Sequence, residues 1–426
     1  MKNLFLCLIL IFSFTDTYTQ FVLKGANAES AGMSAERLKR IDALLKDQYD
    51  KKWLPGAVAI VVRNGVITYH QSMGTSGIGN DQPMKKNDIF RIASMTKPIT
   101  SIAMMILLEE GKYMLDEPVS KYIPEFKTMN VLKDFNEKDS SYTTVPAKKP
   151  ITIRHLLTHT SGIPYGFTNK TAGSIFAKAK VPDLASVENI TIAEKMKVLA
   201  TLPLLHEPGE KFTYGLNTDV LGYLVEVLSG MNLSDFCEKR ILQPIGMSDT
   251  HFFWPESAED RLVKMYGDNK STGLIFKYPA DNPDAKRINY PTKGAKTYFS
   301  GGSGLSSTAL DYAKFLQMIL NGGTYNGNRI VSRKTIELMS TNQIGELTLG
   351  GGTQFGLGFS ILTEKGTFRQ LGSEGRLGWG GAFNTTFWID PKEKLVAVLM
   401  IQIYPTSHQQ ELYTKFETAV YQAIND

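Results

Sequence analysis

The chain has 426 residues, of which 42% are hydrophobic and 21% are charged, as expected of a globular protein with one large domain or two fused lobes. Its 47 Lys and Arg exceed its 42 Asp and Glu by five, and both signs are interspersed along the chain, which argues against a nucleic-acid-binding protein. After the N-terminal segment, no stretch approaches the length of a membrane span.

The N-terminus has the pattern of a secretory signal peptide. A basic start at Lys2 is followed by an apolar run over 4–14 and then by small polar residues, and this run is too short for a stable membrane span. We expect residues 1–19 to be removed by cleavage near Thr19. The mature protein is therefore predicted to be exported, either to the periplasm or out of the cell.

The cysteines limit how an exported chain can be stabilised. Cys7 lies inside the predicted signal peptide, which leaves Cys237 alone in the mature chain, so no intrachain disulfide can form. Stability must come from burial instead. A lipidation site would follow the apolar run, whereas Cys7 lies within it, which argues against a lipoprotein.

The first part of the chain combines helices with a pair of strands. Residues 34–50 carry apolar residues on one face behind a serine cap, which predicts an amphipathic helix. Residues 57–70 contain two β-rich runs joined by Asn64-Gly65, a strong signal for a β-hairpin. Residues 94–110 form an apolar helical pattern closed by a glycine.

The middle and the C-terminal part differ in pattern. From about 115 to 290, short helical patterns alternate with loops rich in Pro, Gly and Asn, with clear helices at 220–230 and 233–247. Beyond Thr292, two helical patterns flank two strand-like runs that meet at an Asp-Pro turn.

Strands near both ends with helices between them predict an α/β (α+β) fold. We expect one lobe built from about 29–114 plus 291–426, and a mostly helical insert lobe over about 115–290. No internal repeat is evident.

The stretch "FRIASMTKPIT" contains a serine followed three residues later by a lysine, Ser94 and Lys97. Residues three apart share a helix face, so the two side chains can meet. If Ser94 opens the helix, its own N–H is unpaired and could serve as half of an oxyanion hole. A neutral Lys97 could take the serine proton, but an S-x-x-K pair alone also arises by chance.

Two further segments complete a candidate site. Tyr214 precedes an apolar helix, and a phenol beside a lysine can form a coupled pair that shares one proton, although a tyrosine there could equally pack in the core. Trp379, Gly380 and Gly381 are expected at the start of an apolar strand, where glycines let a ligand approach the backbone. The N–H of Ala382 is then a candidate second oxyanion donor, with an ordinary edge strand as the alternative.

With these segments in this order, the chain resembles the serine β-lactamase and penicillin-binding-protein superfamily, in particular the class C-like β-lactamase-related hydrolases and family VIII carboxylesterases. The resemblance runs over nearly the whole mature chain and includes "IFRIASMTKPIT", "TIRHLLTHTSGIPY", "EPGEKFTYGLNTDVLG", "ILQPIGMSDT" and "GWGGAFNTTFWIDP". It implies a β-lactamase/transpeptidase-like fold, in which an antiparallel sheet is flanked by helices.

The resemblance also implies an acyl-enzyme mechanism. Ser94 would be the nucleophile, Lys97 and Tyr214 would handle its proton, and the N–H groups of Ser94 and Ala382 would form the oxyanion hole. The substrate would lie against Trp379, Gly380 and Gly381.

Two departures from the family pattern bear on the substrate. Members that hydrolyse β-lactams often carry Tyr-x-Asn, whereas here Leu216 stands two residues after Tyr214 and Asn217, the amide expected to contact the substrate, follows one place later. Trp379 stands where many members have the lysine of Lys-Thr-Gly, as in the esterase branch. Loss of that cation removes about 1.5–3 kcal/mol of attraction for a substrate carboxylate, which favours an uncharged ester.

Other patterns in the sequence give weaker evidence about function. His155 and His159 are four apart, as in some metal sites, but no third ligand is evident, so we expect no metal and no cofactor. The aromatic residues Tyr165, Trp254 and Phe383 could line a pocket, but core packing is the preferred interpretation for each. No G-x-S-x-G elbow is present, which argues against an α/β-hydrolase.

The sequence thus predicts an exported serine hydrolase acting on small esters or amides. A β-lactamase or D-amino-acid peptidase is the alternative within the same chemistry, with a β-lactam or peptide as substrate. A non-catalytic ligand sensor is the alternative outside it. The natural substrate and the oligomeric state are not predicted.

Overall fold

The computed structural model describes residues 22–79, 82–279 and 290–426. The predicted signal peptide, residues 1–19, lies outside this part. Over the described residues, no helix combines the length and the apolar character needed to span a membrane.

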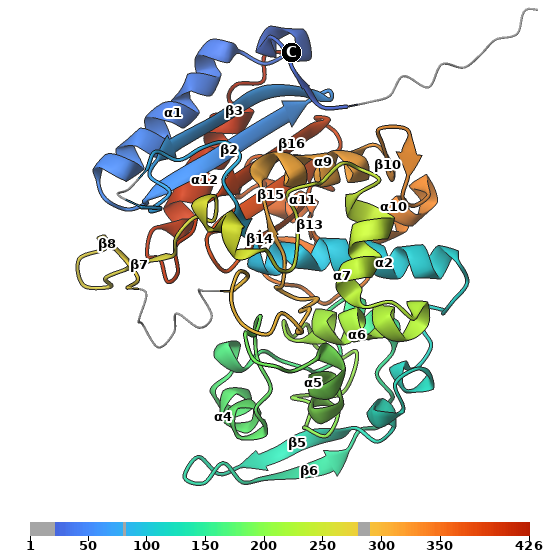
Figure 1. Cartoon of the computed structure of the whole chain (residues 1–426). Coiled ribbons are helices and arrows are strands. Elements are labelled where there is room, and N and C mark those ends of the chain that lie inside the picture. Colours follow the sequence, from blue (N-terminus) through green and yellow to red (C-terminus); the bar gives the residue numbers. More distant parts are fainter. Residues whose placement is uncertain (1–21, 80–81, 280–289) are drawn as a thin grey trace, which may run out of the picture.

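Within the described residues, one sheet of eight strands forms the framework of the molecule (Figure 1). All neighbouring strands are antiparallel except β1 and β3, which are parallel. In spatial order the strands are β1 (Lys24–Gly25), β3 (Val66–Gly74), β2 (Gly56–Arg63), β16 (Leu395–Met400), β15 (Thr385–Asp390), β14 (Leu377–Gly381), β13 (Ser360–Leu362) and β12 (Thr353–Phe355).

A strand from the N-terminal part of the chain and one from the C-terminal part pair at the centre of this sheet. β2 and β16 pair over six residues each and are buried along their whole length, as their continuous runs of Val, Leu, Ile and Ala dictate. The predicted hairpin is confirmed: Asn64 and Gly65 have φ angles of 51° and 76° and connect β2 to β3. Two positive φ angles in a two-residue loop match the right-handed twist of the strands.

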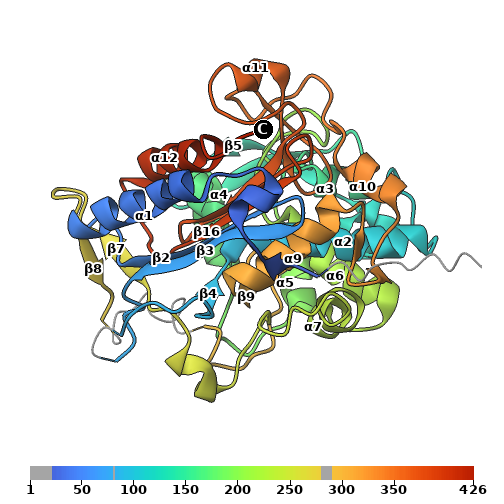
Figure 2. The same ribbon diagram turned by 90° about the horizontal axis from the view of Figure 1, so that it is seen from above.

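Helices cover both faces of the sheet. On one face α1 (Ala35–Asp50) packs beside α12 (Gln409–Tyr421), over a hydrophobic cluster that includes Leu38, Ile41 and Phe416. On the other face lie α9 (Ala309–Leu320) and α2 (Thr96–Glu109), as the view from above shows (Figure 2). The predicted α/β fold with an antiparallel sheet flanked by helices is thus confirmed.

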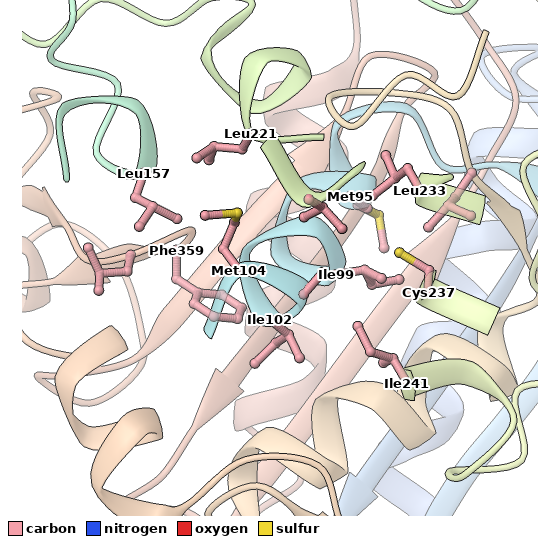
Figure 3. Close-up of a cluster of buried hydrophobic side chains, with 14 of the residues drawn as sticks. Met95, Ile99, Ile102, Met104, Leu157, Leu221, Leu233, Cys237, Ile241 and Phe359 are labelled. Carbon is pink, nitrogen blue, oxygen red and sulfur yellow. The ribbon is translucent and has the colours of Figure 1, made fainter. Parts of the chain in front are cut away.

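Helix α2 is the central element beneath the sheet. Every residue from Thr96 to Leu107 is buried, because this largely apolar helix packs on α6 and α7 and its apolar side chains join the same hydrophobic cluster as residues of the sheet. Figure 3 shows Ile99, Ile102 and Met104 of this helix surrounded by side chains from distant segments, including Phe359. A helix that is held on all sides is a rigid base for side chains at its N-terminus.

The segment between α2 and α9 lies mainly below the sheet in Figure 1 and is rich in short helices. Its helices are α3 (Ile153–Leu157), α4 (Lys170–Ala179), α5 (Ile192–Leu199), α6 (Asn217–Ser229) and α7 (Leu233–Cys237). Its described residues also form two hairpins, β5 (Asn130–Phe135) with β6 (Tyr142–Pro146), and β7 (Tyr266–Asp268) with β8 (Ile275–Lys277). The exact limits of the two lobes remain a prediction.

The remaining elements are short and lie around the main layers. They are β4 (Phe90–Arg91) paired with β9 (Ser306–Ser307), β10 (Thr324–Tyr325) paired with β11 (Asn328–Arg329), α10 (Arg333–Met339) and α11 (Glu364–Thr367).

Two local expectations were wrong. The helix predicted from residue 94 begins at Thr96, and Ala93–Met95 form a separate 3₁₀ turn. Trp379 to Gly381 do not open a strand but end β14, because the chain reverses through Asn384, with φ 67°, into β15. Glycine-rich strands give little periodicity, so the sequence pattern did not reveal the strand before the turn.

Candidate active site

Ser94 lies in a tight turn just before α2. The preceding residue, Ala93, has a φ of +42°, in the left-handed region that a residue with a Cβ rarely adopts. This turn leaves the Ser94 N–H without an acceptor among the described residues, while the carbonyl oxygens of Ala93 and Ser94 receive the N–H of Thr96. The strained turn therefore places the Ser94 side chain and the Ser94 N–H, which has no acceptor among the described residues, at the same point of the chain.

Lys97 is the centre of the polar contacts. Its side chain is only 2% exposed, and its Nζ donates to Ser94 Oγ at 3.2 Å, to the Tyr165 hydroxyl at 2.9 Å and to the Gly302 carbonyl at 2.8 Å. These three oxygens hold the amine in a fixed position beside Ser94. Among the described residues, the hydrogen-bond partners of Lys97 Nζ are two hydroxyls and a carbonyl, and none of them is a carboxylate. The predicted meeting of Ser94 and Lys97 is present.

Two tyrosine rings enclose the Lys97 Nζ, at 5.1 Å from the ring centroid of Tyr165 and 4.7 Å from that of Tyr214. The structure thus brings Tyr214 beside Lys97, as the sequence analysis expects. However, the Tyr214 hydroxyl accepts from Trp379 Nε1 at 3.3 Å, and the hydroxyl that contacts Lys97 is that of Tyr165. Burial, followed by the charge of Asp219, raises the pKa of Tyr165 well above its usual value, so this phenol keeps its proton.

The end of β14 lies against the turn that carries Ser94. A Cβ on Gly381 would collide with the carbonyl oxygen of Ile92, two residues before Ser94, so only glycine permits this approach. The next N–H, that of Ala382, donates to no acceptor among the described residues. Two free backbone N–H groups, from Ser94 and Ala382, are therefore carried by segments in contact, as an oxyanion hole requires.

Asn217 is not brought to the substrate side. It is fully buried at the start of α6, where its Nδ2 donates to His159 Nδ1 and to the Ile163 carbonyl, both at 3.1 Å, and its Oδ1 accepts from Ser161 Oγ. All of its polar atoms are satisfied by the protein. The expected substrate contact is therefore replaced by a structural one, which fixes the loop that carries Tyr165.

The two histidines have separate structural partners. His155 Nδ1 accepts from the Thr152 N–H at 3.2 Å in a capping box at the start of α3. His159 packs against the Tyr214 ring at 4.8 Å between centroids, and burial together with the positive charge of Lys97 lowers its pKa well below the usual value. Within residues 22–79, 82–279 and 290–426, no group of histidine, cysteine and carboxylate side chains has the arrangement of a metal site.

Two residues of the site were missed by the sequence analysis. Tyr165 is fully buried, in agreement with core packing, yet its hydroxyl also reaches Lys97. Asp219 is buried five residues after Tyr214, where it accepts from Ser300 Oγ at 2.6 Å and from the Gly302 N–H at 3.4 Å. The signal available in the sequence was an aspartate at the start of a strongly apolar helix, which is costly to bury without a partner.

At Ser94 the structure brings together a serine hydroxyl, an amine in contact with it and backbone N–H groups that have no acceptor among the described residues, a combination that fits a serine hydrolase. The family model described as Beta-lactamase matches residues 41–419, and the chain belongs to the β-lactamase family.

Relatives and solved structures agree with this assignment. Protein Rv1367c of Mycobacterium tuberculosis is 34% identical over 85% of this chain and 89% of its own length. Esterase EstB of Burkholderia gladioli is 29% identical over 86% of this chain and 91% of its own. The structure of EstCE1, a hydrolase with promiscuous acyltransferase activity, has a TM-score of 0.76 at 24% identity, over 91% of this chain and 99% of that one, and so shares the fold. The protein is a serine hydrolase.

Proposed function

We propose that this protein is a carboxylesterase that cleaves small, uncharged esters through a covalent acyl group on Ser94. The observation that carries the proposal is the 3.2 Å contact between Lys97 Nζ and Ser94 Oγ, next to the Ser94 N–H, which has no acceptor among the described residues. The relative EstB bears the name esterase, which supports the same class of substrate.

The substrate side of the site supports an uncharged ester. Trp379 packs against Tyr214 at 5.3 Å and against Phe355 at 5.2 Å between ring centroids, so an aromatic wall stands at the position where the family resemblance places a lysine. A substrate carboxylate would find no lysine to pair with here, so nothing would offset the free-energy cost of removing its charge from water. An ester with an apolar alcohol or acyl group meets no such penalty.

The reaction would proceed in two halves. Ser94 Oγ attacks the ester carbonyl while its proton passes to the Lys97 and Tyr214 pair, and the carbonyl oxygen, now negative, is held by the N–H groups of Ser94 and Ala382. The C–O bond to the alcohol then breaks, and the pair returns the proton to the departing alcohol. Water attacks the acyl-Ser94 by the same route and releases the carboxylic acid.

Turnover of a short-chain p-nitrophenyl ester tests the proposal. Ser94→Ala should abolish turnover while leaving the unfolding temperature unchanged, and an unaltered rate in this variant excludes Ser94 as the nucleophile. Measuring kcat/KM on one preparation for a small ester, a cephalosporin and a D-Ala-D-Ala peptide separates the esterase from a β-lactamase or a peptidase. A substrate adduct seen by intact mass that forms and never leaves would indicate a sensor.

We also propose that the protein is exported, on the pattern of residues 1–19. Expression of the full chain followed by N-terminal sequencing of the mature protein tests this proposal. A mature N-terminus near residue 20 is expected, and retention of Met1 on a cytoplasmic product would contradict it.

A further inference from the structure

A buried carboxylate lies directly behind the lysine of the site. Asp219, in the first turn of α6, is only 1% exposed. One of its oxygens, Oδ1, accepts from Ser300 Oγ at 2.6 Å and from the Gly302 N–H at 3.4 Å. The other, Oδ2, has no hydrogen-bond partner among the described residues. A buried carboxylate that is only partly satisfied is costly, so its retention calls for a reason beyond packing.

Gly302 connects this carboxylate to Lys97. Its N–H points to Asp219, and its carbonyl oxygen accepts from Lys97 Nζ at 2.8 Å. A Cβ on this residue would collide with Asp219 Oδ2 and would lie 2.8 Å from the Tyr165 hydroxyl. Only a glycine therefore allows the carboxylate, the phenol and the backbone acceptor of the lysine to come together at one residue.

The charges around Asp219 come from several elements. Burial raises the pKa of Asp219, the hydrogen bond from Ser300 and the cation Lys97 of α2 act against that rise, and the anion Asp183 adds to it. The phenols of Tyr165 and Tyr298 lie in the field of this carboxylate. Lys97 in turn faces Tyr214 and the neutral His159. Because no carboxylate touches Lys97 directly in the described part of the chain, Asp219 is the fully buried acid whose charge bears on it.

After burial, the negative charge of Asp219 is the largest cause that raises the pKa of Tyr165 and of Tyr298, so it opposes loss of a proton from these phenols. The same carboxylate fixes the position of the Gly302 carbonyl, which is one of the three acceptors of the lysine.

We propose that Asp219 is a positioning residue of this site: through Gly302 it holds Lys97 against Ser94, and its negative charge acts on the transfer of the Ser94 proton. This inference rests on the proposed function only in taking Ser94 as the nucleophile. It assigns no contact between Asp219 and the substrate.

The test measures how fast Ser94 reacts with a fluorophosphonate, followed by intact mass between pH 5 and 10. This probe forms a bond from Ser94 Oγ to phosphorus, expels fluoride and passes the serine proton to the base, so it requires no knowledge of the natural ester. The variant Asp219→Asn keeps an oxygen for Ser300 and removes the charge. Asp390→Asn is the matched control, because Asp390 is also fully buried and hydrogen-bonded but lies at the opposite end of β15 from Gly381.

Asp219→Asn should lower the midpoint of the labelling profile by about one pH unit, the size of effect that an adjacent charge produces, while Asp390→Asn leaves it unchanged. An unchanged midpoint in folded Asp219→Asn overturns the proposal. If this variant does not fold, Ser300→Ala decides, because it keeps the charge and removes the shorter hydrogen bond to Oδ1. It should slow labelling about threefold to tenfold at every pH without moving the midpoint, and labelling at the wild-type rate overturns the proposal.

The two proposals fail in different ways. Wild-type protein that is labelled at Ser94 but hydrolyses no ester overturns the esterase and leaves the role of Asp219 standing. If the wild type hydrolyses esters but the labelling midpoints of wild type and Asp219→Asn are identical, the role of Asp219 is overturned and the esterase proposal stands. Wild-type protein that is not labelled at Ser94 overturns both.

Discussion

Replacing Tyr165 by Phe tests which phenol supports the lysine. The change removes one of the three acceptors of Lys97 Nζ, the one at 2.9 Å, and leaves the ring that packs against the Tyr214 ring at 5.2 Å between centroids. Lys97 would keep its contacts to Ser94 and to the Gly302 carbonyl but would gain rotational freedom. The expected defect is therefore in catalysis rather than in folding.

The size of the defect follows from the kind of hydrogen bond that is lost. A hydrogen bond to a charged group contributes about 1.5–3 kcal/mol, which corresponds to a fall in kcat of about 10- to 150-fold. KM should change little, because the Tyr165 hydroxyl faces Lys97. Tyr214→Phe, which removes a candidate proton carrier, should lower kcat by about 100- to 10,000-fold.

The assay is the initial rate on a p-nitrophenyl butyrate series, with unfolding temperature measured on the same samples. Tyr113→Phe is the matched control, because Tyr113 is also buried and donates to the Met104 carbonyl at 3.1 Å, toward the far end of α2. Loss of its hydroxyl should reduce stability by about 1 kcal/mol and leave kcat intact. If Tyr165→Phe keeps kcat within about threefold of wild type, the hydrogen bond to Lys97 has no part in catalysis, and the reasoning from this contact is refuted.

Three further changes have expected outcomes. Gly302→Ala drives a methyl group into Asp219, so it should cost about 1–3 kcal/mol in denaturant unfolding and lower kcat by at least about tenfold; wild-type kinetics would contradict the tight fit. Asn217→Ala leaves several buried polar groups without their hydrogen-bond partner and should lower the free energy of unfolding by about 2–4 kcal/mol with KM unchanged. A raised KM would instead indicate that Asn217 contacts the substrate. Burial lowers the pKa of His155 to about 4, and its acceptor bond from Thr152 also needs the neutral ring, so the folded state resists protonation. Its contribution to stability is therefore complete above about pH 6.5 and is lost as the pH falls toward 4, so wild type and His155→Gln should converge in unfolding temperature between pH 7 and 4.5; a gap that stays constant would contradict this.

The sequence alone determined the features that depend on short-range geometry. The spacing of Ser94 and Lys97 placed both on one side of a helical turn, and the Asn64-Gly65 pair fixed the hairpin that begins the sheet. Continuous apolar runs in β2 and β16 identified the centre of the sheet, because a strand covered on both faces has no polar positions. The order of the family segments then supplied the fold class.

Only the tertiary structure decided which groups surround the lysine. Tyr165 and Tyr214 both lie on irregular loops with no periodicity, and the choice between their hydroxyls depends on how those loops are anchored, in part by Asn217. Asp219 reaches the site through a glycine more than eighty positions away, a contact that no local pattern encodes. Local rules act over one or two turns of chain, whereas the protonation of a buried amine depends on every charge packed within a few ångströms of it, whatever its place in the sequence.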